Sequence, residues 1–227
     1  GLYRPHIPFV APKKYFELYE KDNMFVPSDG DEFLKTISPP AAKSLRARKE
    51  QINLDDSTIK TVKEAYYATT SFVDAQVGKV LDKLKETGLD KNTIVVFTSD
   101  HGYHLGEKGH WQKQTLYDRS TRVPLIISGP GIISGLKIED SPVELVDLYK
   151  TIMDMANVST PEFVQGFSLK DVLTKNIQPK RKSALSEVNV YLEGKKAQGY
   201  SIKTDRFRLT RWNLKDKNYY ELYDHKF

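Results

Sequence analysis

The clearest periodicity of the chain lies in residues 57–87, where apolar side chains recur every three or four positions. That spacing places them on one face of a helix, so it predicts a long amphipathic α-helix over this range. Asp55 and the two residues after it are candidate N-caps, and Gly88 fits the position just past the C-terminal end.

Two apolar, β-branched runs, at 93–98 and 123–128, predict buried strands. The tract Ser-Pro-Val-Glu at 141–144 has the pattern of a capping box with proline at the first helical position, and it predicts a helix that ends near residue 156. A shorter helix is expected near residues 168–174. This order of elements favours an α/β fold with a mainly parallel sheet flanked by helices.

From residue 184 the pattern changes to short strands with turn residues between them. The expected strands are 184–190, 200–204, 206–212 and 219–223. Thr-Asp-Arg at 204–206 is a plausible hairpin turn between two of them. We therefore predict two domains, an α/β portion at 1–182 and a small antiparallel C-terminal subdomain at 183–227.

Residues 1–54 show no such periodicity and are punctuated by six prolines. Loops of this length inside a compact domain are unusual. The segment is expected to be irregular and to wrap over another surface, with one short, basic, helix-like patch at 41–50.

Composition narrows the possible classes of function. The 227 residues carry a net charge of +5 and no cysteine, so disulfides and thiol chemistry are excluded. No apolar run is long enough to span a membrane, and no nucleic-acid motif accompanies the scattered lysines and arginines. The positive charge is typical of a lysine-rich surface, or it attracts an anionic substrate.

Candidate chemistry gathers directly after the strand at 93–98. Asp100 and His101 stand where open α/β sheets place their ligands, and a carboxylate beside an imidazole is a metal-ligand pair or a base with its orienting group. Residues 102–113 then supply three glycines, two histidines and two lysines. Such a loop can bring several cations and hydrogen-bond donors to one anionic group.

These residues resemble a known family. The tract Thr-Ser-Asp-His-Gly-x-x-Leu-Gly-Glu at 98–107, followed by Trp111 and Lys113, is similar to the second metal-binding segment of the sulfatases, which belong to the alkaline-phosphatase superfamily. Three further segments resemble other parts of the same family: 5–9, 199–204 and 221–224. The likeness runs along the whole chain, and the group that it resembles most is that of the iduronate-2-sulfatases.

Two features of the family are missing. Its nucleophile is a formylglycine made from Cys or Ser in a Cys/Ser-x-Pro/Ala-x-Arg motif, and neither this motif nor the family's N-terminal aspartate pair occurs here. The resemblance therefore implies that the chain is the C-terminal half of a sulfatase, and that the N-terminal half of the same enzyme is its partner. By the same likeness the location is periplasmic, extracellular or lysosomal.

The resemblance also implies roles for individual residues. Asp100 and His101 are expected to complete a Ca²⁺ site that is shared with the N-terminal half. Lys113 is expected to bind the sulfate and to stabilise charge on the leaving group, and His6 to contact the sulfate or the leaving oxygen. For Lys113 and His6 the alternatives are an exposed surface lysine and a structural histidine.

Other residues are candidates for contact with the substrate. Tyr103 and His104 are expected to line the substrate pocket. Two adjacent residues are ambiguous, because His110 fits a structural role and Trp111 fits either a sugar-stacking role or that of a buried loop anchor. The three arginines that could bind a carboxylate, or instead form surface ion pairs, are Arg4, Arg119 and Arg122.

The sequence thus predicts a sulfuric ester hydrolase that removes sulfate from a sulfated uronic acid or glycosaminoglycan. Three alternatives remain open. They are a choline-type sulfatase, a phosphonate or phosphate ester hydrolase of the same superfamily, and a non-catalytic fragment that binds sulfated glycan. The chain alone is expected to be inactive, because it lacks the nucleophile.

Overall fold

The computed structural model describes residues 1–28, 30–138 and 141–226, and its contacts divide the chain into two compact units. The first unit comprises Gly1–Lys35, Arg48–Thr93 and His104–Gln112. The second comprises Thr36–Ala47, Ile94–Tyr103 and Lys113–Phe227.

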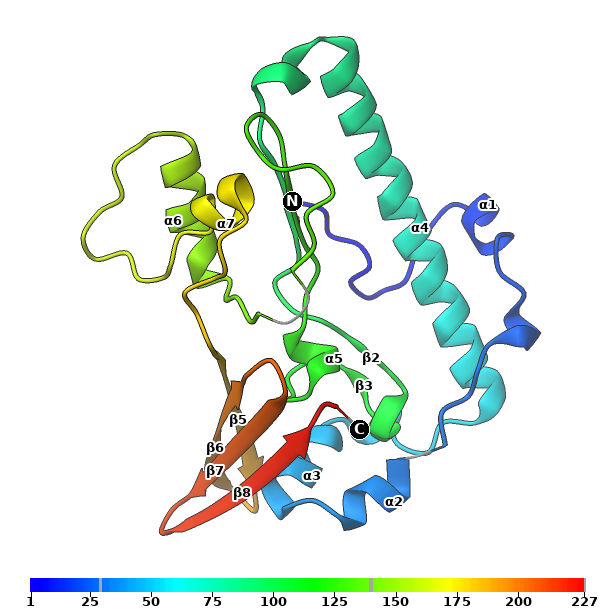
Figure 1. Cartoon of the computed structure of the whole chain (residues 1–227). Coiled ribbons are helices and arrows are strands. Elements are labelled where there is room, and N and C mark those ends of the chain that lie inside the picture. Colours follow the sequence, from blue (N-terminus) through cyan, green and yellow to red (C-terminus); the bar gives the residue numbers. More distant parts are fainter. Residues whose placement is uncertain (29, 139–140, 227) are drawn as a thin grey trace. The chain divides into compact units, whose positions relative to one another are not determined.

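The first unit is organised by one long helix, α4 (Asp56–Glu86), which Figure 1 shows as a single unbroken coil. The Asp55 carboxylate accepts the backbone N–H of Thr58 at 3.0 Å and so caps the first turn. Gly88 follows the end of the helix at φ +69°, a left-handed conformation that glycine adopts without strain. The predicted helix and both of its end signals are confirmed.

The N-terminal segment packs along α4 through two short helices, α1 (Lys13–Phe16) and the 3₁₀ helix η1 (Lys21–Asn23). The hydroxyls of Tyr19 and Ser71 lie 2.6 Å apart, which ties the segment to the helix. The surface over which this irregular segment wraps is therefore α4 of the same chain.

Short elements complete the first unit. They are α2 (Gly30–Lys35), the 3₁₀ helices η2 (Lys49–Gln51), η3 (Leu89–Asn92) and η4 (Glu107–Gly109), and the hairpin strands β2 (His104–Leu105) and β3 (Trp111–Gln112). The helix-like patch expected at 41–50 is helical only in part, as α3 (Pro39–Leu45), which belongs to the second unit.

The two predicted strands form β1 (Val95–Thr98) and β4 (Leu125–Ser128), and they pair antiparallel. The prediction that they are buried is wrong for this structure, because every residue of both strands is exposed or half-buried. The prediction of a mainly parallel sheet is also wrong for the part of the chain that the structure describes, where every strand pair is antiparallel. Parallel neighbours need a long crossover, usually a helix. The connection between β1 and β4 contains instead a small hairpin and the four-residue helix α5 (Asp118–Thr121), and β4 returns beside β1 in the opposite direction.

The C-terminal region forms a four-stranded antiparallel sheet in the order β5-β6-β7-β8. Its strands are β5 (Ala184–Leu192), β6 (Lys195–Lys203), β7 (Phe207–Leu214) and β8 (Lys217–Asp224). The predicted turn at 204–206 joins β6 to β7. Strand β6 begins earlier than expected, because Glu193 and Gly194 both have positive φ and form a tight two-residue turn after β5.

One face of this sheet is buried against α3, as Figure 1 shows. Its core cluster consists of Ala41, Leu116, Val190, Ala197 and Trp212. A side chain at Gly199 would collide with the ring of Trp212 at 2.6 Å, so glycine is required at that position. Alternate residues of each strand point to the other, exposed face.

The helix predicted from the capping box begins later than expected, as α6 (Val146–Met155), and is followed by α7 (Lys170–Lys175). The capping box does not form. The carboxylate of Glu144 pairs with Arg181 at 2.8 Å and accepts the backbone N–H of Leu185 at 2.6 Å, so it is not available to cap the helix. Asp147 accepts the Glu144 N–H instead.

None of the helices in the described residues combines the length and the apolar character needed to cross a membrane.

Candidate active site

The loop after β1 presents Asp100 to solvent. The backbone N–H of His101 donates to Oδ1 of Asp100 at 3.0 Å, and the hydroxyl of Ser99 donates to the carbonyl of His101 at 2.9 Å. These bonds fix the turn while 85% of the Asp100 side chain stays exposed. An exposed carboxylate held by its own loop is placed to take part in binding a cation.

The ring of His101 is oriented by its own loop. Its Nδ1 lies 2.8 Å from the carbonyl oxygen of Gly102, which can only accept a hydrogen bond. Nδ1 therefore carries the proton, and Nε2 of the neutral ring is left with its lone pair. Nε2 lies 3.7 Å from Oδ2 of Asp100, so the two side chains face the same region.

Gly102 anchors this loop to helix α5. Its N–H donates to the carbonyl of Ser120 at 2.8 Å, and an added Cβ would lie 2.1 Å from the carbonyl oxygen of Arg119. No side chain fits in that gap. The position of Asp100 and His101 thus depends on the position of α5.

Helix α5 is in turn held by the C-terminal sheet. The guanidinium of Arg208, on β7, donates to Asp118, to the hydroxyl of Thr121 at 3.0 Å and to the hydroxyl of Ser201 at 2.9 Å. The Arg208 side chain is only 3% exposed. His225 approaches the other carboxylate oxygen of Asp118 at 3.3 Å. The first and last residues of α5 are therefore both fixed from the sheet.

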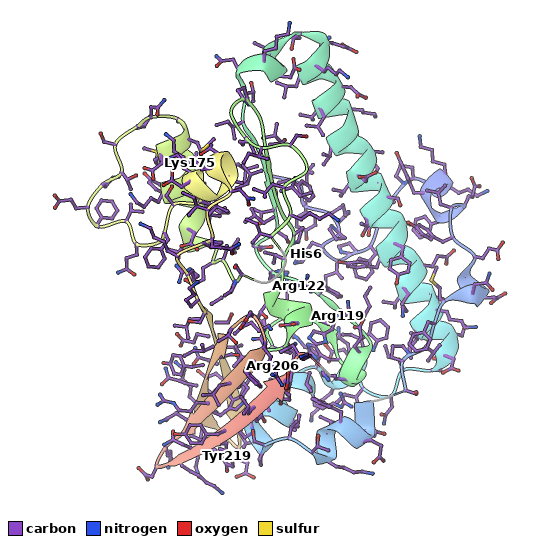
Figure 2. The ribbon with its side chains drawn as sticks, viewed as in Figure 1. His6, Arg119, Arg122, Lys175, Arg206 and Tyr219 are labelled. Atoms are coloured by element: carbon purple, nitrogen blue, oxygen red, sulfur yellow. The ribbon has the colours of Figure 1, made fainter. Side chains whose placement is uncertain are left out.

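An open hollow of about 1860 Å³ lies in the second unit beside these elements. Three of the predicted residues line it: Asp100, His101 and Lys113. Arg119 and Arg122, both exposed, also line it. Figure 2 shows the two side chains on α5 and on the residue that follows it. The lining also contains acidic side chains, including Asp118 and Asp205, so the basic groups that could hold an anionic ligand share the hollow with carboxylates.

His6 belongs to the first unit, whereas the residues that line the hollow belong to the second. It is exposed, its Nδ1 lies 2.7 Å from the carbonyl oxygen of Ile7, and its ring lies 4.9 Å from that of Tyr3. Arg4 donates to the carbonyl of His6 at 3.0 Å. Its neighbours therefore hold the imidazole in place, and its contact with the sulfate stays a prediction.

The two proposed substrate contacts Tyr103 and His104 belong to different units. Tyr103 is half-buried and is not among the described residues that line the hollow. His104 is fully buried, at 0% exposure, and its ring packs edge-on against His110 at 4.8 Å. Trp111 is 5% exposed and packs over Gly106, which agrees with the alternative of a buried loop anchor.

Sequence reasoning missed the residues that the C-terminal sheet contributes. Lys203, Asp205 and Arg208 from the β6–β7 hairpin line the hollow together with His225. The tract at 199–204 carried a family signal, but nothing in its spacing linked it to Asp100. Only the strand register and the α5 contacts bring these residues together.

The donor set meets the needs of calcium only in part. Calcium takes about six to eight oxygen ligands. Asp100 supplies one exposed carboxylate, and the described residues contain no group of three or more potential metal-binding side chains. Asp100 and His101 therefore fit as part of a calcium site and do not form one by themselves.

Comparison with known proteins identifies the family. The model of a family described as Sulfatase matches residues 1–158. The chain belongs to the sulfatase family. A second family model, described as N-sulphoglucosamine sulphohydrolase, C-terminal, matches residues 106–227.

Individual relatives carry several different names. A sulfatase of Formosa agariphila is 33% identical over 97% of this chain, and an iduronate 2-sulfatase of Mus musculus is 32% identical over 71% of it. Further matches are named arylsulfatase, choline-sulfatase and, among solved structures, 2-O GAG sulfatase. The membership is thus in the sulfatase family as a whole and not specifically in the iduronate-2-sulfatase group.

The fold is shared with solved structures of the same superfamily. The phosphonate monoester hydrolase of Silicibacter pomeroyi is 29% identical and matches 98% of this chain with a TM-score of 0.85. This likeness identifies the sulfatase-like α/β fold. The chain spans 43% of the Formosa protein, 36% of the mouse protein and 48% of the hydrolase, so it corresponds to less than half of each relative.

Proposed function

We propose that the protein to which this chain belongs hydrolyses sulfate esters of carbohydrates. The observation that carries the proposal is the gathering of Asp100, His101 and Lys113 around one hollow at the end of β1. A lysine and an oriented imidazole can hold a sulfate ester and neutralise charge on it, and an exposed carboxylate can help to bind a cation beside it.

In this proposal the residues have separate tasks. Lys113 places a compact positive charge on the ester oxygens, where negative charge develops as the leaving group departs. Asp100 and His101 would contribute ligands to calcium, which when bound would supply further positive charge at the sulfate. The nucleophile comes from residues outside this chain, because the chain has no cysteine and no matching serine motif. His6 is proposed as a contact to the sulfate or to the leaving oxygen.

For the substrate we propose a sulfated uronic acid or a glycosaminoglycan. Lys113, Arg122 and Lys203 are among the residues that line the hollow, and each can hold one anionic group of a substrate with more than one negative charge. Two of the matched proteins carry names of this kind, iduronate 2-sulfatase and 2-O GAG sulfatase.

Turnover of 4-methylumbelliferyl sulfate by the intact protein tests the proposed reaction. We expect release of the fluorescent product by the wild type and its near loss in Lys113→Ala. Lys175→Gln is the matched control, since that exposed lysine lies on α7 and pairs with Asp171 at 2.8 Å, apart from the residues that line the hollow (Figure 2). A wild type without turnover, under conditions in which its nucleophile is formed, would refute the proposal.

The second candidate is a phosphonate or phosphate ester hydrolase, favoured by the structural match to the phosphonate monoester hydrolase. Both reactions place a tetrahedral anionic ester among basic groups. The wild type assayed with 4-nitrophenyl sulfate and with 4-nitrophenyl phenylphosphonate separates them, because the preferred substrate shows the higher kcat/KM. Binding of a sulfated glycan without turnover of either ester would instead favour a non-catalytic role.

A further inference from the structure

Strand pairing brings two cations to the same wall of the hollow. Lys203, the last residue of β6, is paired across the sheet with Arg208 of β7. Arg208 donates to the hydroxyl of Thr121, and Arg122 is the next residue of the chain. Lys203 and Arg122 both line the hollow, although 81 positions separate them in the sequence (203 − 122).

Neither cation forms a salt bridge with a carboxylate among the residues that the structure describes. Lys203 donates only to the backbone carbonyl of Asp205, at 3.3 Å, and Arg122 is exposed without a side-chain bond there. The two neighbouring acids are already engaged. Asp118 pairs with Arg208 and His225, and one carboxylate oxygen of Asp205 accepts the backbone N–H of Arg206 at 2.9 Å.

The electrostatic environment of Lys203 agrees with this geometry. Burial is the main cause that lowers the pKa of Lys203, and the negative charge of Asp118 opposes it most strongly. Arg208 lowers the pKa, Asp205 raises it, and Arg122 makes the smallest contribution, which lowers it. Lys203 and Arg122, which line the same hollow, are therefore close enough for a weak repulsion between them. An anion bound between them would relieve that repulsion and would restore part of the solvation lost by Lys203.

We infer that Lys203 and Arg122 form a second anion subsite, which binds a second anionic group of the sulfated sugar while its ester sulfate lies at Asp100 and Lys113. This inference rests on the proposed function and specifies its substrate. The guanidinium of Arg122 offers a planar fork to a carboxylate or a sulfate, and Lys203 offers a point charge. The shared requirement is a substrate with two negative groups, such as a sulfated uronic acid or a disulfated sugar.

Equilibrium binding tests the subsite without depending on turnover. Glucuronate, which carries a carboxylate but no sulfate ester, is titrated into the intact protein by calorimetry. We expect Lys203→Gln and Arg122→Gln each to weaken its binding by about tenfold, the effect of losing one hydrogen bond to a charged group. Arg211→Gln is the matched control, because this substitution also removes one positive charge, but from the exposed face of the same sheet. Unchanged affinity in both subsite variants would overturn the inference.

Kinetics then distinguish the two kinds of anion and the two proposals. For a 2-sulfated uronic acid or a disulfated sugar, we expect the subsite variants to raise KM about tenfold with little change in kcat. For 4-methylumbelliferyl sulfate, which has no second anion, their kcat/KM should equal that of the wild type. Equal decreases in kcat/KM for both types of substrate would show that the two residues have a general structural role, and would refute the subsite. Glucuronate binding that depends on Lys203 in a protein without sulfatase activity would refute the proposed reaction and leave the subsite standing.

Discussion

The contact between Asp118 and Arg208 should be strongly asymmetric when either partner is removed. Arg208 is buried, with its side chain 3% exposed, and its Nε has no partner among the described residues. Asp118 is 32% exposed and keeps a second partner in His225. The two ends of the same ion pair therefore differ in how well solvent can replace the lost contact.

The structure sets the size of each effect. Asp118→Ala leaves a buried guanidinium with only hydroxyl acceptors, a change that costs about 3–5 kcal/mol of stability. Arg208→Met fills a similar volume with an apolar chain and leaves Asp118 in contact with water and with His225. Its cost should be close to that of one hydrogen bond to a charged group, about 1.5–3 kcal/mol. We therefore expect Asp118→Ala to be the more damaging variant by about 2 kcal/mol, the difference between these ranges.

Amide hydrogen exchange of β6 and β7 in the intact protein measures this difference locally. Asp224→Ala is the control, since it removes the partner of the more exposed Arg206 and should cost less than about 1 kcal/mol. If Asp118→Ala lowers the stability of the sheet no more than Arg208→Met does, the reasoning is refuted, because Arg208 is then not effectively desolvated.

Three further predictions concern activity, pH and association. Lys113→Ala in the intact protein should lower kcat by about 10²–10³-fold. Lys113→Arg should also lose activity, because a planar guanidinium does not replace the point charge of an ammonium group. Near wild-type turnover in either variant would show that Lys113 is an exposed surface residue. Burial raises the pKa of Asp147, but hydrogen bonds from Arg181 and two backbone N–H groups outweigh it, so the net pKa is lowered. The contribution of Asp147 to the free energy of unfolding should therefore be present above its unfolded pKa of about 3.9 and be lost as the pH falls below it. In urea titrations between pH 3 and 7, the free energy of unfolding of Asp147→Asn should vary less with pH than that of the wild type. The purified 227-residue chain should self-associate and bind a dye for apolar surfaces, since Ile126 and Leu222 are 59% and 67% exposed. It should hydrolyse no sulfate ester, since the nucleophile is absent. A monodisperse monomer in sedimentation that does not bind the dye would contradict the predicted self-association.

Local signals in the sequence were sufficient where the interactions are local. The apolar period of α4, the Asp55 cap and Gly88 lie within one segment, so the helix and its ends could be predicted. The hairpin at 204–206 follows from the same kind of short-range pattern. The direction of β4 could not be predicted in this way, because it depends on how the chain returns from β1 and not on the apolar residues of either strand.

Long-range competition explains the capping box that failed. Ser141 and Glu144 have the right spacing, but Glu144 is bound by Arg181 and by the N–H of Leu185, 37 and 41 positions further along the chain. Asp147, which the sequence did not single out, takes over the Glu144 N–H and also accepts two bonds from Arg181. A strong distant cation thus displaced a weaker local cap, and no local pattern carries that information.

Only part of the candidate site could be predicted from the sequence. Asp100, His101 and Lys113 lie within 14 consecutive residues (100–113), so a motif could show them. Lys203 enters the hollow only because β6 pairs with β7 and because Arg208 of β7 holds α5. The lining of the hollow thus comes from both sides of the boundary predicted at residue 183. If the proposed function is correct, the residues around the reacting sulfate belong to a family motif, whereas those that select the rest of the substrate come from the sheet. Substitutions in the sheet should then change which sulfate ester is preferred before they abolish hydrolysis.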